Sequence, residues 1–423
     1  MRRSTTVLVS FAVCILGGLI GTFASLTLAE AACALPTSVK VTLFQAHPDI
    51  KSLTVDGAFE LSQGGGSSTL RHVEISVAKS GLQWTGGKSV QGGKAVQRAG
   101  ARIVIRPLGW TPLRLKPGSA EARPYRGRFI ITTSGGRLNV INEVDSRSYI
   151  TSVVGSESVP EFPLEALKAQ AVLATTVLAR QRPNMKLADS TDVQAYLGSD
   201  YERPLAKQAV DVVFGQTLTT TSGTTPAVFY HSTCAGGTSD EREIFSGKVL
   251  NDAGRKAVSS CRIAVRVKCS YCQASPFFKP HVVSYTLAEL KQKVGCVPIS
   301  IDVRDPQGRP LSVTVEQVSL DKKQSKNVSL SGYALWLKLG QGLGWGAVPG
   351  MRYSFEKTAT GSSDGPSSVP NSPPSASAIT ITSTGAGHGA GLCQWGAAGM
   401  AREGKTYKNI LHYYFPLAEV STK

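Results

Sequence analysis

The stretch PLEALKAQAVLATT, residues 163–176, predicts the central element of the fold. Apolar side chains in and just beyond it recur at the spacing of one helix face: Leu164, Leu167, Ala171, Ala174 and Leu178. Several positions between them are also Ala, which is small enough for close packing. We therefore expect a long helix that is buried on more than one face. Pro163 suits the first helical position, and Pro183 marks its end.

Upstream of this helix the pattern is strand-like. Short β-rich runs are separated by Gly-rich turns: VTLF (41–44), SLTVDGAFEL (52–61), HVEISVAK (72–79), ARIVIRPL (101–108), GRFIITT (127–133) and RLNVINEV (137–144). We expect a small antiparallel β-domain over residues 37–125, followed by a core over 126–357. The helix that begins at Pro163 is then the first convincing helix of the chain.

Downstream, helix and strand signals are mixed. We expect a helix over 205–215, a strand over 226–233, irregular Cys-rich sequence over 234–300 and strands over 299–357. Residues 358–378 contain mostly turn-forming residues and predict a flexible insertion. The core resumes over 379–420, with helices ending near Arg402 and Tyr414. The prediction is an α+β, strand-rich mixed fold with a small N-terminal β-domain and a catalytic core built around one long buried helix.

Composition limits the function. The 423 residues carry a net charge of +17, spread along the chain without a Lys/Arg tract, so we expect no nucleic-acid partner. A basic protein is attracted to other polyanions, such as cell-wall polymers or anionic lipid.

Residues 1–34 predict export. Arg2 and Arg3 precede an uncharged run over 7–28, and the small residues of 29–34 follow. This pattern is typical of a secretory signal peptide, but the run is also long enough for a single membrane anchor, and both alternatives stay open. Either way, the rest of the chain is expected outside the cytoplasm, secreted to the wall or periplasm or held at the membrane.

Glu157 is the first candidate for chemistry. It follows the apolar residues 153–154 and precedes a Pro-rich turn into the helix. A carboxyl group partly buried there would have a raised pKa and could act as a general acid or base. The structural alternative is an acid that caps the helix or pairs with a surface Lys.

The stretch FYHSTCAGGTSDE (229–241) supplies a second set of candidates. His231 and Cys234, together with Cys269 and Cys272, have the residue types and spacing of a zinc site. Disulfides among the same cysteines are the alternative, since an exported chain meets an oxidising compartment. Ser232 and His231 are adjacent on a predicted strand and point to opposite faces, which argues against a Ser–His nucleophile pair.

The third candidate stretch is the Gly-rich segment around His388. Glycines on both sides would let a ligand approach the backbone, although a tight packing crossover explains them equally well. Gln394 and Trp395 follow directly and suit a sugar, because an indole ring covers an apolar sugar face and an amide makes paired hydrogen bonds.

Together these stretches resemble the SpoIID/LytB family, named for stage II sporulation protein D and an amidase enhancer. The resemblance lies in three ordered motifs: PLEALKAQAVLATT (163–176), YHSTCAGG (230–237) and GHGAGLCQWGAAGMA (387–401). It covers roughly residues 38–420. The chain departs from the family pattern at Ser158 and Val159, and it has Thr175 where the family usually has Arg.

The resemblance implies peptidoglycan remodelling. Some members are lytic transglycosylases that cut the MurNAc–GlcNAc bond with one Glu, which falls on Glu157 here, and leave a 1,6-anhydro sugar. The substrate-binding residues expected from the motifs are Lys168, Gln170, Tyr230, His231, Ser232, His388, Gln394 and Trp395. This chemistry requires no cofactor, and a structural zinc on His231, Cys234, Cys269 and Cys272 is the one metal considered.

Two other functions stay open. The first is a non-catalytic wall-binding protein that stimulates a partner amidase, which the departures at Ser158, Val159 and Thr175 favour. The second is a zinc amidase. The expected partners are peptidoglycan glycan strands and, for the enhancer, a cell-wall amidase.

Overall fold

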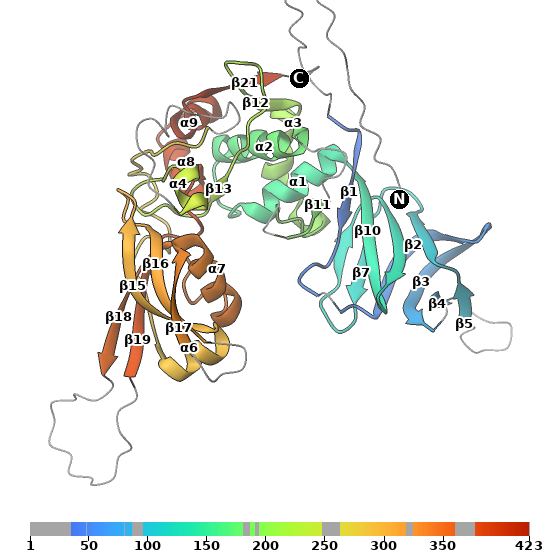
Figure 1. The fold of residues 1–423 in the computed structure, drawn as a ribbon. Coiled ribbons are helices and arrows are strands. Elements are labelled where there is room, and N and C mark those ends of the chain that lie inside the picture. The colour runs from blue at the N-terminus through green and yellow to red at the C-terminus, as the bar shows by residue number, and fades with distance from the viewer. Residues whose placement is uncertain are drawn as a thin grey trace, which may run out of the picture. The chain divides into compact units, whose positions relative to one another are not determined.

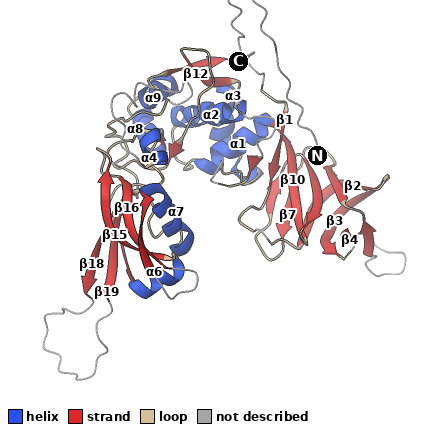
Figure 2. Cartoon of the chain, in the orientation of Figure 1, coloured by secondary structure: helices blue, strands red, loops and turns tan. Residues whose placement is uncertain are grey.

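The computed structural model describes residues 35–47, 49–79, 81–86, 96–180, 187–190, 194–247, 263–318, 325–359 and 377–422. The predicted signal peptide or anchor and Cys261 lie outside these ranges. The fold is α+β, as predicted, with strand-rich regions that flank a group of helices in the chain (Figures 1 and 2).

The N-terminal region forms one 11-stranded sheet in the order β11-β1-β10-β9-β6-β2-β3-β4-β5. Off this order, β7 pairs with β2, and β8 pairs with β7. Its strands are β1 (Ser38–Thr42), β2 (Ser52–Gln63), β3 (Gly66–Ala78), β4 (Gly81–Gly86), β5 (Val96–Ala99), β6 (Arg102–Pro107), β7 (Leu113–Pro117), β8 (Arg123–Tyr125), β9 (Arg128–Ser134), β10 (Arg137–Asp145) and β11 (Leu187–Ala188). The sheet extends beyond the β-domain expected over residues 37–125, because β9 and β10 have neighbours on both sides within it.

A helix that the sequence analysis missed follows β10 directly. Helix α1 (Ser146–Glu157) begins at Asp145, whose side chain accepts a hydrogen bond from the Ser148 N–H. The prediction that the first convincing helix begins at Pro163 is therefore wrong. Ser, Thr and Val dominate α1 and have weak helix propensity, but its buried face packs in the main core, and this tertiary packing compensates.

Helix α2 (Leu164–Ala179) is the predicted buried helix. Pro163 is its N-cap rather than its first helical residue. Its buried side chains lie on several faces, and it contacts α1, α3 (Pro204–Val213), α8 (Gln394–Arg402) and α9 (Tyr407–Tyr414) (Figure 2). Small Ala side chains permit this close approach from several sides.

Two short pairings connect distant segments to this group of helices. β13 (Tyr230–His231) pairs in parallel with β20 (Leu392–Cys393), and β12 (Gln216–Thr220) pairs antiparallel with β21 (Ala418–Thr422). The strand expected over 226–233 is thus only two residues long. Two smaller helices, η1 (Ser199–Tyr201) and α4 (Glu241–Ser246), lie in the connections.

Residues 281–384 build a second hydrophobic core from two three-stranded sheets. One contains β14 (His281–Thr286), β19 (Ser377–Thr384) and β18 (Arg352–Ala359). The other contains β15 (Cys296–Arg304), β16 (Pro310–Val318) and β17 (Ser325–Ser331), and α6 (Leu287–Lys293) and α7 (Gly332–Leu343) complete this core. β18 and β19 pair antiparallel, and residues 360–376 between them, where the insertion is predicted, lie outside the described residues.

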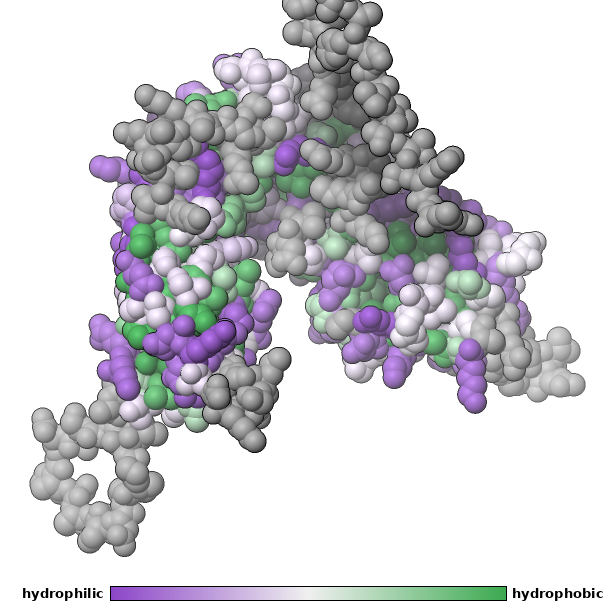
Figure 3. Space-filling view, in the orientation of Figure 1, coloured by the Kyte–Doolittle hydropathy of each residue, from purple (hydrophilic) through white to green (hydrophobic). Residues whose placement is uncertain are grey.

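On the face shown in Figure 3, hydrophilic side chains lie beside hydrophobic ones over both strand-rich regions. This is the pattern of sheets that have one solvated side. No helix in the described ranges has both the length and the apolar character needed to cross a membrane.

Candidate functional site

The three sequence motifs meet around Glu157. Glu157 is the last residue of α1, Gln170 lies in the middle of α2, Tyr230 lies on β13, and Gln394 begins α8. The β13–β20 pairing places Tyr230 opposite Leu392, two residues before Gln394. The Gln394 Nε2 donates to the Glu157 backbone oxygen at 2.9 Å and to Gln170 Oε1 at 3.4 Å. One amide therefore connects all three helices.

The Glu157 carboxyl group is half-buried, and its hydrogen bonds favour the charged form. The Ala195 N–H donates to Glu157 Oε1 at 2.5 Å, and the Tyr230 hydroxyl faces the carboxyl group. Burial nevertheless raises the pKa of Glu157, and these two donors offset only part of that rise. The negative end of the α1 dipole acts in the same direction as burial. Glu157 thus has the environment of a general acid.

Buried polar atoms without a hydrogen-bond partner of ordinary geometry in the described structure gather here. They include the Tyr230 hydroxyl, Gln170 Nε2 and both side-chain amide atoms of Gln194. The Tyr149 hydroxyl, which faces Gln194, is in the same state. Such atoms are rare in folded proteins, and a group of them suggests a function other than packing.

Gln194 and Tyr149 were missed by sequence reasoning. Sequence analysis assigned no role to the segment 194–198, which runs along α1, with hydrogen bonds from the Ser152 hydroxyl to the Gly198 oxygen and from the Leu197 N–H to the Ser156 hydroxyl. Gly155 makes this approach possible, because a Cβ there would collide with the Tyr201 carbonyl oxygen. Gly155 was the one residue in the sequence that could have indicated a close approach of another segment to α1. It lies in a helix that no sequence pattern predicted, so its meaning was not apparent.

Trp395 and Ser232 lie beside this group. The Trp395 ring contacts Phe162 edge-on, with centroids 5.2 Å apart, and Phe162 lies in the segment between α1 and α2. The backbone N–H of Trp395 donates to the backbone oxygen of Ser232 at 3.1 Å. The Ser232 hydroxyl contacts Thr233 rather than a histidine, in agreement with the rejection of a Ser–His pair.

The two histidines form a pair of their own. The His231 and His388 rings are 5.6 Å apart, and His231 Nδ1 lies 3.0 Å from the Ala390 oxygen. Burial lowers the pKa of His231 well below its usual range and that of His388 to about 4, so both are neutral at pH 7. Among the contacts of the described residues, none joins either ring to Glu157.

The glycines around His388 serve chain packing. Gly391 has φ +75°, and a Cβ there would collide with the Phe229 carbonyl oxygen. Gly389 has φ +80° and faces the Arg309 guanidinium group. The space beside these two glycines is occupied by other parts of the protein. This favours close packing of chain segments over the approach of a ligand to the backbone.

Lys168 lies apart from the other predicted binding residues. Its Nζ pairs with Glu165 Oε1 at 2.6 Å and lies 5.9 Å from the Tyr407 ring centroid. These contacts direct it toward α9. Thr175, at the position of the family arginine, is buried and donates to the Ala171 oxygen at 2.8 Å.

The cysteines gather differently from the prediction. Cys234, Cys269 and Cys272 meet Cys393, and the four sulfurs all lie within 4.8 Å of one another. His231 is not in this group, and its Nδ1 lies 3.0 Å from the Ala390 oxygen. The predicted fourth ligand is therefore corrected to Cys393. All five cysteines in the described ranges are free, and Cys296 lies in the second core.

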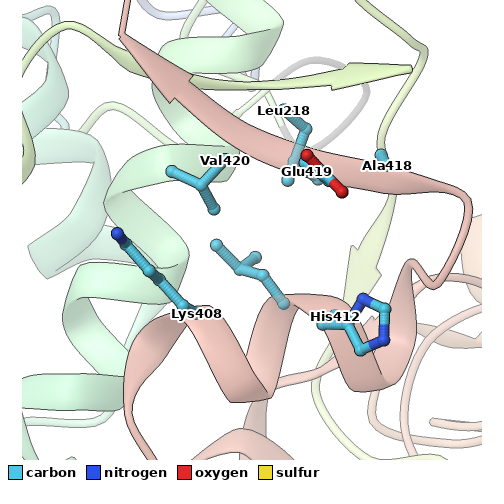
Figure 4. A pocket seen from close by; sticks show the side chains of 7 residues that line it. Leu218, Lys408, His412, Ala418, Glu419 and Val420 are labelled. Carbon is cyan, nitrogen blue, oxygen red and sulfur yellow. The ribbon is translucent and has the colours of Figure 1, made fainter. Parts of the chain in front are cut away.

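A shallow pocket lies elsewhere, between α9 and the β12–β21 pair (Figure 4). Leu218, His412 and Val420 are among its lining residues. None of the residues around Glu157 lines it.

The fold and site define an α+β protein in which one half-buried carboxyl group lies between helices from distant parts of the chain. Residues 134–220 match the family model SpoIID, described as stage II sporulation protein. The stage II sporulation protein D of Bacillus subtilis is 28% identical over 333 residues, which are 74% of this chain and 84% of the relative. That of Bacillus amyloliquefaciens is 28% identical over 302 residues, 66% of this chain and 75% of the relative.

An uncharacterised protein of Brachyspira hyodysenteriae is 27% identical over 301 residues, 69% of this chain and 70% of that protein. The family model and these relatives support a SpoIID family assignment for this chain. That assignment supports a sporulation-related role in remodelling the cell wall.

Proposed function

We propose that this chain is an exported lytic transglycosylase that cleaves the MurNAc–GlcNAc bonds of peptidoglycan glycan strands, with Glu157 as its single acid and base. The observation that carries the proposal is the environment of Glu157. Its carboxyl group is half-buried, has a raised pKa, and is surrounded by buried polar atoms that make no hydrogen bond of ordinary geometry. No second carboxylate contacts it in the described part of the chain, which fits a reaction that uses a single carboxyl group.

A single carboxyl group suffices when the sugar supplies its own nucleophile. Protonated Glu157 donates its proton to the glycosidic oxygen, and the GlcNAc hydroxyl leaves. The resulting carboxylate then accepts the proton of the MurNAc C6 hydroxyl while O6 bonds to C1. The 1,6-anhydro ring closes, Glu157 is protonated again, and no water is consumed. A hydrolytic glycosidase uses a second carboxyl group as nucleophile or to activate water.

The surrounding residues fit recognition of a sugar. Gln170 and Gln194 offer polar atoms without an ordinary hydrogen bond for hydroxyl and acetamido groups, and Trp395 offers an aromatic ring at the border of the site. Gln394 holds the Glu157 backbone and Gln170 in register, which keeps the carboxyl group in place.

The test is product analysis by mass spectrometry after digestion of purified wall glycan. Wild type is expected to release 1,6-anhydro sugars, and Glu157→Gln to release at least about 100-fold less, because an amide cannot transfer the proton. Glu161→Gln is the matched control, since Glu161 is exposed and four residues away. Equal rates for the wild type and the Glu157→Gln variant would refute the role of Glu157.

A second candidate is the non-catalytic enhancer of a wall amidase. It is favoured by Thr175, whose buried, internally bonded hydroxyl replaces the family arginine, and by Ser158 and Val159 after the acid. In that case the purified chain releases no sugar, binds glycan, and accelerates a partner amidase equally well with Gln at position 157.

A further inference from the structure

The four sulfurs of Cys234, Cys269, Cys272 and Cys393 have the arrangement of ligands around one metal ion. All four side chains are buried, and every pair of sulfurs lies within 4.8 Å. Cys234 Sγ and Cys272 Sγ are 3.6 Å apart. Four thiolates at about 2.3 Å from a tetrahedral zinc ion have sulfurs about 3.8 Å apart. The observed spacing requires only small side-chain shifts to reach this geometry.

The same spacing argues against the alternatives. A disulfide needs its sulfurs at about 2.05 Å, far closer than the Cys234–Cys272 pair. A cluster of several irons holds its cysteine sulfurs farther apart than a single ion does, and sulfurs that all lie within 4.8 Å leave room for one ion.

Hydrogen-bond donors reach two of the four sulfurs, and a cation lies beside the group. The N–H groups of Cys234 and Gly396 both donate to Cys393 Sγ at 3.3 Å, and the Tyr414 hydroxyl lies 3.2 Å from Cys269 Sγ. The fully buried Arg309 donates to the Cys234 backbone oxygen at 2.8 Å and places a positive charge beside the group. Hydrogen-bond donors and a nearby cation offset the excess negative charge of four thiolates on a divalent ion.

We propose that Cys234, Cys269, Cys272 and Cys393 bind one structural zinc ion that ties the turn after β13, the 269–272 segment and the start of α8 together. Four cysteines fill a tetrahedral shell, so the site has no open position for a substrate or a catalytic water. The proposal is independent of the glycan-cleaving function.

The site explains how two candidate residues are positioned. Cys393 immediately precedes Gln394, which bonds the Glu157 backbone and Gln170. Cys234 lies on the turn that follows Tyr230. A metal ion that fixes both cysteines fixes the register of β13 against β20, on which the approach of Tyr230 to Glu157 depends.

The test is the metal content of the purified full-length chain, measured by mass spectrometry under reducing conditions. Wild type is expected to hold about one zinc per chain, and Cys272→Ser markedly less. Cys296→Ser is the matched control, because Cys296 is also buried but lies in the second core. Chelation should lower the melting temperature of the wild type and of Cys296→Ser alike.

Cys272→Ser could fail to fold, so a second measurement uses the wild type alone. After chelation, titration with Co²⁺ should give the strong visible absorption of a tetrahedral thiolate complex, and zinc should abolish it. Wild-type protein with intact thiols that takes up neither metal would overturn the proposal. So would bound iron, or a disulfide between any two of the four cysteines.

Discussion

At the scale of single residues, the pKa of Glu157 links stability to pH. Because burial raises the pKa in the folded state, the native protein binds this proton more tightly than the unfolded chain does. Its contribution to stability is therefore fully present below the ordinary pKa of 4.5 and is lost as the pH rises through the folded value. The melting temperature of wild type relative to Glu157→Gln should fall over that window. A difference that is constant with pH would contradict this environment.

Tyr230 tunes the same group. Its hydroxyl stabilises the Glu157 carboxylate, so Tyr230→Phe should raise the pKa of Glu157 further. A general acid must be protonated to act, and activity should consequently persist to higher pH in the variant than in wild type. The pH profile of anhydro-sugar release measures this shift. A slower enzyme with an unchanged profile would mean that Tyr230 only contributes to packing or substrate binding.

The candidate residues show how far a sequence motif predicts the composition of a site. Glu157, Gln170, Tyr230 and Gln394 were selected from three separate stretches, and the structure brings them together. The histidines were grouped with them because the same motifs contain them, yet their side chains face the Ala390 region instead. A motif specifies neighbours in sequence, while the direction of each side chain depends on the tertiary packing.

At the scale of secondary-structure elements, one hydroxyl joins the buried helix to a strand. Thr176 Oγ1 in α2 accepts from the Leu218 N–H in β12 at 2.9 Å, and both groups are buried. Thr176→Ala leaves that N–H without a partner and should cost about 1–3 kcal/mol of unfolding free energy in urea titrations. Thr176→Ser keeps the hydroxyl and should recover most of the loss. Equal losses in both variants would assign the effect to the methyl group.

Long elements with a strong period were predictable, and short ones were not. The buried helix has apolar residues on every turn, so its sequence alone indicated it. Helix α1 lacks such a pattern, and its stability comes from the side chains it buries against the sheet and α2. β13 and β20 are two residues each, and only their mutual pairing across the fold defines them.

At the scale of the whole molecule, Arg309 connects the second core to the residues near the cysteines. Its guanidinium group donates to Ser239 Oγ and to the backbone oxygens of Cys234 and Gly237, and Asp305 balances its charge. Arg309→Ala removes this charge and leaves Asp305 and the backbone oxygens buried without their partner. It should lower the free energy of unfolding by about 3–5 kcal/mol. The exposed Arg402→Ala is the control. A loss below about 1 kcal/mol in denaturant titrations would contradict this role.

The α+β class followed from the alternation of strand and helix patterns, and the resemblance to the SpoIID family followed from three ordered motifs. The extent of the first sheet and the separate second core did not follow from the sequence. Both depend on pairings between residues far apart in the chain, such as β1 with β10 and β14 with β19. No local pattern specifies which strands will be neighbours.

The central claim is that one carboxyl group cleaves the glycan while the sugar provides the nucleophile. Digestion of purified wall glycan in oxygen-18 water tests it most directly, because ring closure consumes no water and hydrolysis incorporates one oxygen per cut. Mass spectrometry should find anhydro products without the label, and none from Glu157→Gln. Reducing sugars that carry the label at the newly formed ends, released by wild type and lost in Glu157→Gln, would contradict the account.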